Sequence, residues 1–478
     1  MVKLRLIDGV FLVAGSMIGS GIFIVSADIA RTTAGGGFLL LSWFIAGLMT
    51  LLGALAFAEL SGMFPKSGGQ YIYLREAYNP FISFLYGWTI FMVVNCGTIA
   101  AVAVAFSKYS GELVPWFSMK NILLDLGFVK ISSAQLLSVV LIVFLTWLNA
   151  KGIQYGKFIL RIFTSVKIIS LAMIIILGLL VFRNADVWQI NLLSFWNAQS
   201  VRVENGEIIS RILSGTGLLM AIGTGLVGSL FSCDAWTNVS YIAGEIERPS
   251  RNIPKSLIYG VGLVALLFLL VNVAYLNLLP LTGSPGATDA FSKGIQFADQ
   301  DRVGTAAATV MFGASATIIM AVLIMISTFG CNNGIILAGA RMYQAMAADG
   351  LFFAKMKDNN RNEVPGFALW IQAIWASVLC LSGQYGQLLD YVMFSVMIFY
   401  IITIVAVYIL RVRRPDIERP YKAMGYPYLP ALYILLAAAF CLNLIINKPE
   451  FCVPSLVIVF LGAPVYFIWR RVYLVKNS

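Results

Sequence analysis

The sequence contains no histidine. It therefore lacks the side chain most often used as a general base, a metal ligand or a pH switch near neutrality. The six cysteines lie within or at the edges of apolar segments, and none forms a Cys-x-x-Cys pair, so the pattern indicates neither a zinc site nor a disulfide framework. We expect no metal and no cofactor, and any proton transfer must use carboxylates or lysines.

Charge is also scarce. Charged residues make up 12% of the 478 residues and hydrophobic residues 60%, a composition typical of a chain embedded in lipid. The N-terminal "MVKLRLIDG" leads directly into an apolar run, which predicts a first spanning helix rather than a cleavable signal peptide. Function is therefore to be sought among membrane proteins.

Twelve apolar segments are long enough to predict spanning helices, and this makes both termini lie on one side. They cover residues 8–32, 37–61, 82–109, 133–150, 158–182, 213–242, 255–280, 305–335, 366–384, 387–410, 428–446 and 453–469. Of the 33 Lys and Arg residues, 22 fall on the side of the N-terminus and 10 on the other side, with Lys167 inside the fifth segment. Because basic residues collect in cytoplasmic loops, this asymmetry predicts cytoplasmic termini and explains the net charge of +11 without a nucleic-acid partner.

Two of these segments are interrupted near their midpoints. The first contains "GSMIGSGIF", and the sixth contains "GSLFSCDAWTN" with the acidic Asp234. Paired interruptions in two halves of a chain are the best sequence indicator of a binding site in an inverted-repeat transporter. For the first segment alone, close helix packing through Gly15 and Gly19 is the stronger interpretation. The third glycine, Gly21, and the second interruption favour binding. For Asp234, the alternative is a helix cap or an interhelical hydrogen bond.

A helix broken inside the membrane offers two kinds of unpaired backbone group. Free N–H groups at the start of the second half suit a carboxylate, and free carbonyls at the end of the first half suit an ammonium. A site with both is complementary to a zwitterionic amino acid. Lys167 lies about 15 Å of helical rise beyond the basic start of its segment, which is deep for a side chain that reaches the membrane surface. We expect its ammonium to face the bundle interior and to bind carbonyls of the broken helices.

Six motifs, in order along the chain, resemble those of the amino acid–polyamine–organocation transporters, and within them the bacterial members similar to the L-type amino acid transporters. They are "GSMIGSGIF", "AELSGMFPKSGGQYIYLREAYNP", "FTSVKIISL", "SLFSCDAWTNVSYIAGEIERPSRNIPKSL", "GARMYQAMAADGLFF" and "LRVRRPDIERPYK". The resemblance implies an all-α integral membrane fold of twelve helices. A first inverted repeat of five helices would cover residues 1–182, a second 213–410, and residues 411–478 would hold two additional helices and a short cytoplasmic C-terminus.

The resemblance also implies roles for individual residues in alternating access. The substrate carboxylate would meet the backbone amides of Ser20 and Gly21, next to Gly19. The amino group of the substrate would meet carbonyls of Met17 or Ile18 and of Phe231. Ser232, Cys233 and Asp234 would complete the site. Phe231 would close over the substrate, and Lys167 matches the family lysine thought to replace a sodium ion. Many relatives have glycine where this chain has Asp234, so the effect of that residue on selectivity stays open.

The resemblance further bears on partners and selectivity. Helix ten, "DYVMFSVMIFY", lacks the asparagine that some eukaryotic relatives place near the side-chain pocket, which implies a small or apolar pocket. The loop Gly111–Ser133 has no cysteine, so no disulfide-linked heavy subunit is expected.

The leading hypothesis is a sodium-independent exchanger or uniporter of small or neutral amino acids in a bacterial inner (plasma) membrane. A cationic amino acid or polyamine transporter of the same fold, and a proton-coupled permease, are alternatives. An integral-membrane enzyme would need a catalytic constellation that the sequence does not offer, and a channel would need filter segments that are not apparent.

Overall fold

Helices form nearly the whole of the computed structural model, which describes residues 3–125, 130–204, 207–313, 315–382 and 385–477. The elements of the first part are α1 (Leu6–Met17), α2 (Gly21–Thr33), α3 (Gly36–Met63), α4 (Gln70–Ala77), α5 (Pro80–Thr89), the π-helix η1 (Ile90–Asn95), α6 (Cys96–Leu113), α7 (Ser133–Ala150), α8 (Ile153–Ile176), the π-helix η2 (Leu177–Val181) and α9 (Ala185–Leu193).

The second part continues in the same way. Its helices are α10 (Gly215–Ser232), α11 (Asn238–Tyr241), the short 3₁₀ turn η3 (Ala243–Glu245), α12 (Pro249–Leu278), α13 (Ala290–Lys293), η4 (Asp299–Asp301), α14 (Val303–Phe312), α15 (Ala316–Ala348), η5 (Ala354–Lys357), α16 (Gly366–Leu381), α17 (Tyr385–Arg413), α18 (Tyr428–Asn447) and α19 (Pro449–Asn477).

Within the described residues, ten helical stretches are long and apolar enough to cross a membrane. The pair α1 and α2, bent by 43° at its break, makes an eleventh. The ninth predicted segment corresponds to α16, a shorter apolar helix of 16 residues. The architecture is thus that of a helical membrane protein, and the full count of twelve spans stays a prediction.

Three segment boundaries differ from those expected. The predicted eighth segment, 305–335, is two elements, because α14 ends at Gly313 with a left-handed φ of +73° and α15 then continues to Ala348. In the sixth segment the regular helix ends at Ser232, whereas the expected segment continues to residue 242. The twelfth begins at Pro449 and extends beyond the apolar run to Asn477.

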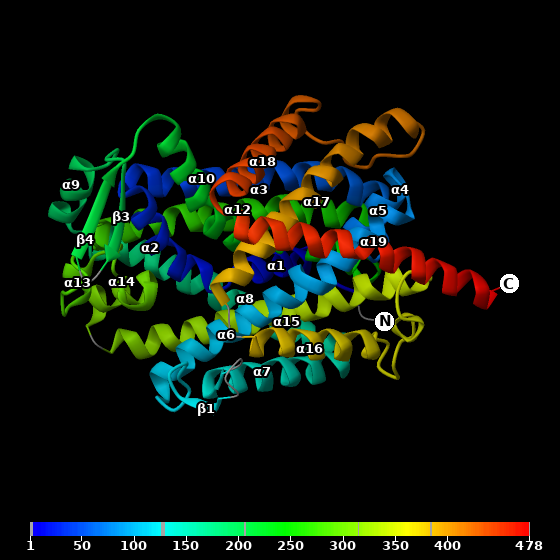
Figure 1. Cartoon of the computed structure of the whole chain (residues 1–478), viewed down its shortest axis with the longest axis horizontal. Coiled ribbons are helices and arrows are strands. Elements are labelled where there is room, and N and C mark those ends of the chain that lie inside the picture. Colours follow the sequence, from blue (N-terminus) through cyan, green and yellow to red (C-terminus); the bar gives the residue numbers. More distant parts are fainter. Residues whose placement is uncertain (1–2, 126–129, 205–206, 314, 383–384, 478) are drawn as a thin grey trace.

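Two antiparallel hairpins were not expected from the sequence. The first pairs β1 (Ile122–Asp125) with β2 (Lys130–Ser132), and the second pairs β3 (Gln199–Glu204) with β4 (Glu207–Ile212). Figure 1 shows β3, β4, α9 and α13 at one end of the bundle, whereas both chain termini lie at the other end. Both termini therefore lie at the same end of the bundle, and their position relative to a membrane stays a prediction.

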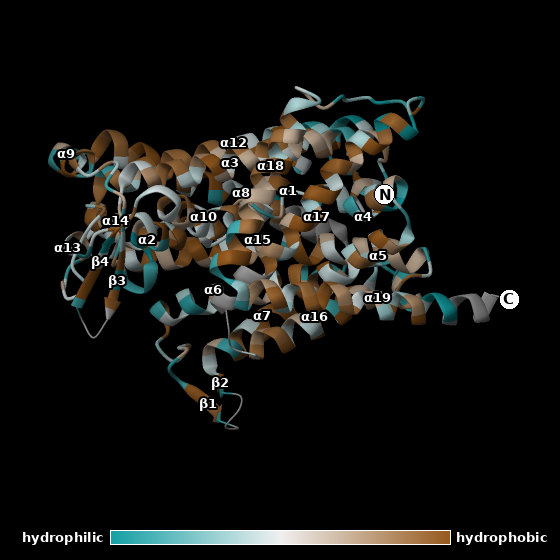
Figure 2. Ribbon diagram, turned by 45° about the horizontal axis from the view of Figure 1, so that its top comes forward, coloured by the Kyte–Doolittle hydropathy of each residue, from teal (hydrophilic) through white to brown (hydrophobic). Residues whose placement is uncertain are grey.

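The broken helices lie in the middle of the bundle. Helix α1 packs against α8, α12 and α15, and α2 packs against α10. The ribbons of the bundle helices in Figure 2 are largely in the hydrophobic colour, and leucines on the spans, such as Leu180, Leu219 and Leu435, are more than 60% exposed. Apolar side chains on the outside are what a lipid solvent allows. The interior is also largely apolar, and the polar groups that the breaks expose lie within it.

Candidate functional site

The first break lies between Met17 and Gly21. Ile18 leaves the helix with extended backbone angles (φ −75°, ψ 91°), and α2 begins again after Ser20. Met17, Ile18 and Ser20 are all buried. Unwound backbone at this depth is tolerated only where other protein groups or a bound molecule satisfy it.

Side chains from two neighbouring helices satisfy most of the carbonyls at this break. Ser327 of α15 donates from Oγ to the carbonyl oxygens of Ile18 at 3.1 Å and Gly19 at 3.3 Å. Cys331, one turn further along α15, donates to Ser16 at 3.0 Å. The Met17 carbonyl accepts the backbone N–H of Gly19 at 2.9 Å. The carbonyl side of the break is therefore held by α15 and by the chain itself.

Lys167 of α8 supplies the charge at this break. Its Nζ atom donates to the carbonyl oxygens of Gly15 at 2.7 Å and Ile18 at 2.8 Å. The side chain is only 2% exposed, so it does not reach the membrane surface. No carboxylate lies within ion-pair distance of Lys167 among the residues that the structure describes. The buried amino group of Lys167 is thus held by two backbone carbonyls of α1.

The amide side of the break has no such partners. Within the described part of the chain, the backbone N–H groups of Ser20 and Gly21 make no hydrogen bond. They belong to the first turn of α2, where the helix leaves its N–H groups unpaired and its dipole is positive. This end of α2 can therefore receive an anionic group.

The three glycines of the motif have different surroundings. A Cβ on Gly15 would lie 2.3 Å from Oγ1 of Thr164 in α8, so Gly15 allows close packing of α1 on α8. A Cβ on Gly21 would lie 2.1 Å from Oγ of Ser232, so Gly21 allows the two breaks to touch. A Cβ on Gly19 would meet only Sγ of Cys331, at an ordinary 3.6 Å. Gly15 and Gly21 therefore both allow close packing, the first of α1 on α8 and the second of α2 on α10, and a binding role stays a prediction.

The second break follows Ser232 in α10. Ala235 has a left-handed φ of +66°, which is strained for a residue with a Cβ, and only the four-residue helix α11 and a 3₁₀ turn follow. The carbonyl of the half-buried Phe231 accepts the backbone N–H of Asp234 at 3.1 Å. Cys233 is buried and its N–H bonds to the carbonyl of Ser229 at 3.0 Å.

Asp234 forms an interhelical hydrogen bond, as one of the two interpretations of this residue expected. Its Oδ1 atom accepts from the hydroxyl of Tyr400 in α17 at 2.6 Å. No Lys or Arg pairs with Asp234 among the described residues. The carboxylate therefore borders the interior of the bundle with a neutral partner.

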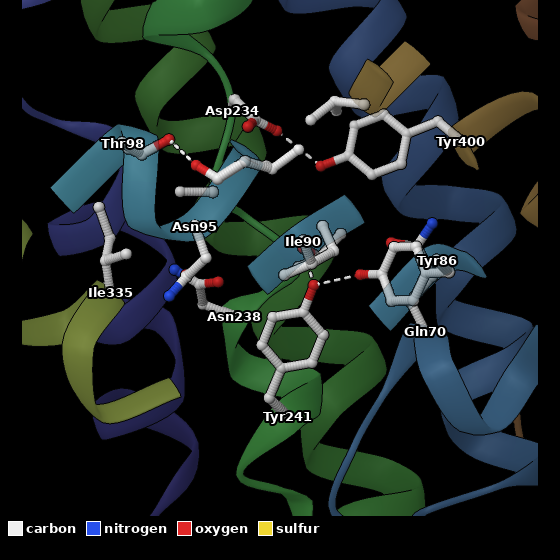
Figure 3. A pocket seen from close by; sticks show the side chains of 14 residues that line it. Gln70, Tyr86, Ile90, Asn95, Thr98, Asp234, Asn238, Tyr241, Ile335 and Tyr400 are labelled. Atoms are coloured by element: carbon white, nitrogen blue, oxygen red, sulfur yellow. Dashed lines mark hydrogen bonds between the residues drawn. The ribbon is translucent and has the colours of Figure 1, made fainter. Parts of the chain in front are cut away.

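Asp234 also lines a cavity, shown in Figure 3. The lining includes the π-helix η1 through Ile90, Val94 and Asn95. Its other members mix polar side chains with the apolar Ala235, Ile335 and Val396; the polar ones are Gln70, Tyr86, Thr98, Thr237, Asn238, Tyr241 and Tyr400. The cavity volume of about 30 Å³ accommodates one or two water molecules, so an amino acid requires the cavity to widen.

The candidate residues are not all brought together in this conformation. Of the nine positions expected at the substrate site, Asp234 lines the cavity and the other eight do not, although Gly21 and Ser232 lie close to one another. A hydrogen bond of 2.5 Å between the hydroxyls of Tyr86 and Tyr241 crosses the cavity (Figure 3). Neither tyrosine, nor Tyr400, was singled out in the sequence, because a tyrosine in an apolar run carries no signal of its own.

Ion pairs lie at both ends of the bundle. At the end that carries the hairpins, Arg31 contacts Asp301 at 2.6 Å and Arg302 contacts Glu112 at 2.6 Å. At the end that carries the termini, Arg341 contacts Glu245 at 2.5 Å, and both side chains are nearly buried. Burial raises the pKa of Glu245, and the Arg341 guanidinium opposes this rise. These pairs thus link helices that are far apart in the sequence, at both ends of the bundle.

Comparison with known proteins agrees with this arrangement. A family model for amino acid permeases matches residues 4–469, so the chain belongs to the amino acid permease family of the amino acid–polyamine–organocation superfamily. It is 28% identical to the serine/threonine exchanger SteT of Bacillus subtilis (strain 168) over 468 residues, which are 97% of this chain and 96% of the relative.

Two mammalian relatives are similar at the same level. The mouse b(0,+)-type amino acid transporter 1 is 28% identical over 455 residues, covering 94% of this chain and 83% of the relative. The mouse large neutral amino acids transporter small subunit 2 is 27% identical over 474 residues, covering 98% and 80%. This chain is accordingly a multi-pass membrane transporter of the amino acid type rather than an enzyme.

Proposed function

We propose that this permease moves small or neutral L-amino acids across the membrane by sodium-independent exchange, with alternating access around the two helix breaks. The observation that carries this proposal is the break at Ile18–Ser20. There the amide groups of Ser20 and Gly21 have no hydrogen-bond partner among the described residues, while Lys167 and Ser327 donate to the neighbouring carbonyls. The site therefore offers free donors to an anionic group and needs no added cation at those carbonyls.

The substrate carboxylate would bind the N–H groups of Ser20 and Gly21. The amino group would bind the carbonyl of Met17 or Ile18 on the side of α1, and the Phe231 carbonyl and the Asp234 carboxylate on the side of α10. Each of these groups already accepts at least one hydrogen bond within the protein, and the Met17 and Phe231 carbonyls and the Asp234 carboxylate have a further lone pair for the substrate ammonium. Phe231 would close over the bound substrate. The backbone of Ser232 and Cys233 would line the same side of the site, and Gly19 would leave room for the substrate.

Lys167 would take the place of a transported cation. Its two hydrogen bonds to Gly15 and Ile18 hold the unwound backbone in the absence of an ion. Transport would then not depend on sodium.

A second candidate function is the transport of cationic amino acids or polyamines. It is favoured by Asp234, whose carboxylate has a tyrosine hydroxyl and no basic side chain as partner among the described residues. An ammonium or guanidinium on the substrate would supply the missing positive charge. A proton-coupled permease is a third possibility, in which Asp234 itself would take up the proton.

The topology completes the proposal. We infer twelve spans, with inverted repeats over 1–182 and 213–410 and two further helices in 411–478, in a bacterial inner (plasma) membrane with cytoplasmic termini. All six cysteines are buried and unpaired, which supports transport without a disulfide-linked subunit.

The test is uptake of radiolabelled amino acids into liposomes that contain the purified protein. We expect uptake of neutral amino acids that is stimulated by internal amino acid and unchanged when sodium is replaced by choline. Uptake of arginine or a polyamine with no uptake of neutral amino acids would replace the first proposal by the second. An absolute sodium requirement would contradict the role of Lys167.

A further inference from the structure

A second cavity lies at the end of the bundle that carries the chain termini, away from the helix breaks. Its volume is about 570 Å³, and its lining combines charged and aromatic side chains: Arg75, Phe81, Asp349, Tyr466, Phe467 and Arg470. These residues come from α4, the start of α5, the turn after α15, and the last part of α19. None of them belongs to the proposed transport site.

The level of this cavity in the membrane follows from where the spans end. The span Pro80–Leu113 begins at the cavity, and the span Ala316–Ala348 ends directly before Asp349. The span Pro449–Arg471 ends one residue after Arg470. Figure 1 shows α5 and α19 lying side by side near the C-terminus, and contacts join the two helices. Because three spans end here, the cavity lies where hydrocarbon gives way to headgroups.

The cavity carries an excess of positive charge. Asp349 is the carboxylate among the lining residues, and it already accepts hydrogen bonds from the hydroxyl of Tyr71, at 2.8 Å, and from Arg75. Arg470 has no ion-pair or hydrogen-bond partner among the residues that the structure describes. The N-terminus of α5 also faces this cavity through Asn79 and Pro80, which adds the positive end of a helix dipole. An anion would therefore find an unpaired guanidinium in a partly enclosed space.

The rest of the lining is apolar and continues onto the lipid-facing surface. Phe81 packs against Tyr466 and Phe467, with ring centroids 5.1 Å and 5.8 Å apart. Phe467 and the next residue, Ile468, are 61% and 64% exposed. A small soluble anion would use only the arginine, whereas a molecule with a phosphate and a hydrocarbon chain would cover both parts of the surface.

We propose that this cavity binds the headgroup phosphate of an anionic phospholipid. Arg470 contacts the phosphate. Arg75 adds positive charge from the other side of the cavity while it keeps its pair with Asp349. An acyl chain lies against Phe81 and Phe467. The bound lipid would thereby join α19 to α5 and to the end of α15 at the membrane surface.

The test is native mass spectrometry of the full-length protein in detergent after addition of equal amounts of phosphatidylglycerol and phosphatidylcholine. We expect the wild-type protein to retain phosphatidylglycerol in preference to phosphatidylcholine. Arg470→Gln should reduce that preference by about fivefold, the effect of one arginine at a membrane surface. The matched control is Arg471→Gln, which removes an exposed charge from the adjacent residue outside the cavity lining and should leave the preference unchanged.

Several outcomes would overturn the proposal. Equal retention of the two lipids by wild type, or equal losses in Arg470→Gln and Arg471→Gln, would mean that only general surface charge acts. Displacement of phosphatidylglycerol by millimolar inorganic phosphate would mean that the site takes free phosphate rather than a lipid. The unfolding temperature of each variant, measured without added lipid, distinguishes a lost lipid contact from a damaged fold.

Discussion

The Nζ atom of Lys167 lies 2.7 Å from the carbonyl oxygen of Gly15, and it is buried in the centre of the bundle. An ammonium placed in this way contributes hydrogen bonds of the charged type, which stabilise a structure more than neutral ones do. It links α8 to the unwound end of α1, so a change at Lys167 acts directly on the backbone that we propose binds the substrate.

Lys167→Ala should therefore abolish most transport. The substitution removes one hydrogen-bond donor from each of the buried carbonyls of Gly15 and Ile18. Because these carbonyls belong to the break, we expect uptake to fall by about tenfold or more. Uptake into liposomes measures the effect, with size-exclusion chromatography as the check on folding. The control is Lys355→Ala, at an exposed position in η5. Near-normal uptake by Lys167→Ala would contradict the proposed role.

Gly21→Ala should impair substrate binding through a steric clash. The added Cβ would lie 2.1 Å from Oγ and 2.9 Å from Cβ of Ser232, and overpacking of this kind costs about 1–3 kcal/mol. We expect binding to weaken by about tenfold, measured by the scintillation proximity of a labelled amino acid.

Two further variants separate the clash from a general loss of helix flexibility. Ser232→Gly combined with Gly21→Ala removes both close atoms and leaves the nearest at 3.4 Å, so it should restore binding. Gly225→Ala in α10, whose Cβ would meet only the side chains of Ile29 and Thr32, at 3.8 Å or more, should bind nearly as wild type. If Gly225→Ala and Gly21→Ala are equally impaired, the contact between the two breaks is not the cause.

Asp234→Asn tests which substrates this carboxylate serves. If Asp234 receives the amino group common to all substrates, the KM values for serine and arginine should rise together, by about tenfold. A rise for arginine alone would favour the cationic alternative. Tyr400→Phe removes the hydroxyl that donates to Asp234 at 2.6 Å, and should change KM in the same direction by a smaller factor. Unchanged KM values in Asp234→Asn would exclude the residue from the site.

Glu245→Ala should destabilise the end of the bundle that carries the termini. It leaves the nearly buried Arg341 without its carboxylate, and removing one partner of a buried ion pair costs about 3–5 kcal/mol. We expect a clear fall in unfolding temperature in detergent. Glu245→Ala with Arg341→Met should lose less than the sum of the single variants, because the pair is removed together.

An exposed ion pair provides the comparison for that measurement. Lys130 and Asp125 lie 3.1 Å apart with both side chains about half exposed, so Asp125→Ala should cost less than about 1 kcal/mol. An equal fall in unfolding temperature for Asp125→Ala and Glu245→Ala would show that burial of the Glu245–Arg341 pair does not increase its contribution to stability.

The broken helices could be located from residue types alone. Glycine and polar residues in the middle of apolar runs are unfavourable in a lipid-exposed helix, so their position in "GSMIGSGIF" and "FSCDAW" indicated where regular helix would end. The depth of Lys167 followed from its distance along a helix. These are local properties, and each is encoded within a few residues.

Several other features depend on contacts between distant segments. The π-helix at Ile90–Asn95, the division of residues 305–335 into α14 and α15, and the short α11 after the second break have no distinctive composition. The cluster of Tyr86, Tyr241 and Tyr400 comes from three separate helices. A single run of sequence carries no information about such partners.

The sequence by itself determined that this chain is a helical membrane transporter, where its two central helices break, and that a lysine lies among them. It did so because lipid excludes unpaired polar groups, which makes each exception in an apolar run visible. Only the tertiary structure decided which glycine serves packing and which serves the contact of the two breaks, since Thr164 and Ser232 approach from other helices. It also decided that Asp234 faces Tyr400 in a cavity still too small for an amino acid, because that distance is set by packing across the whole bundle.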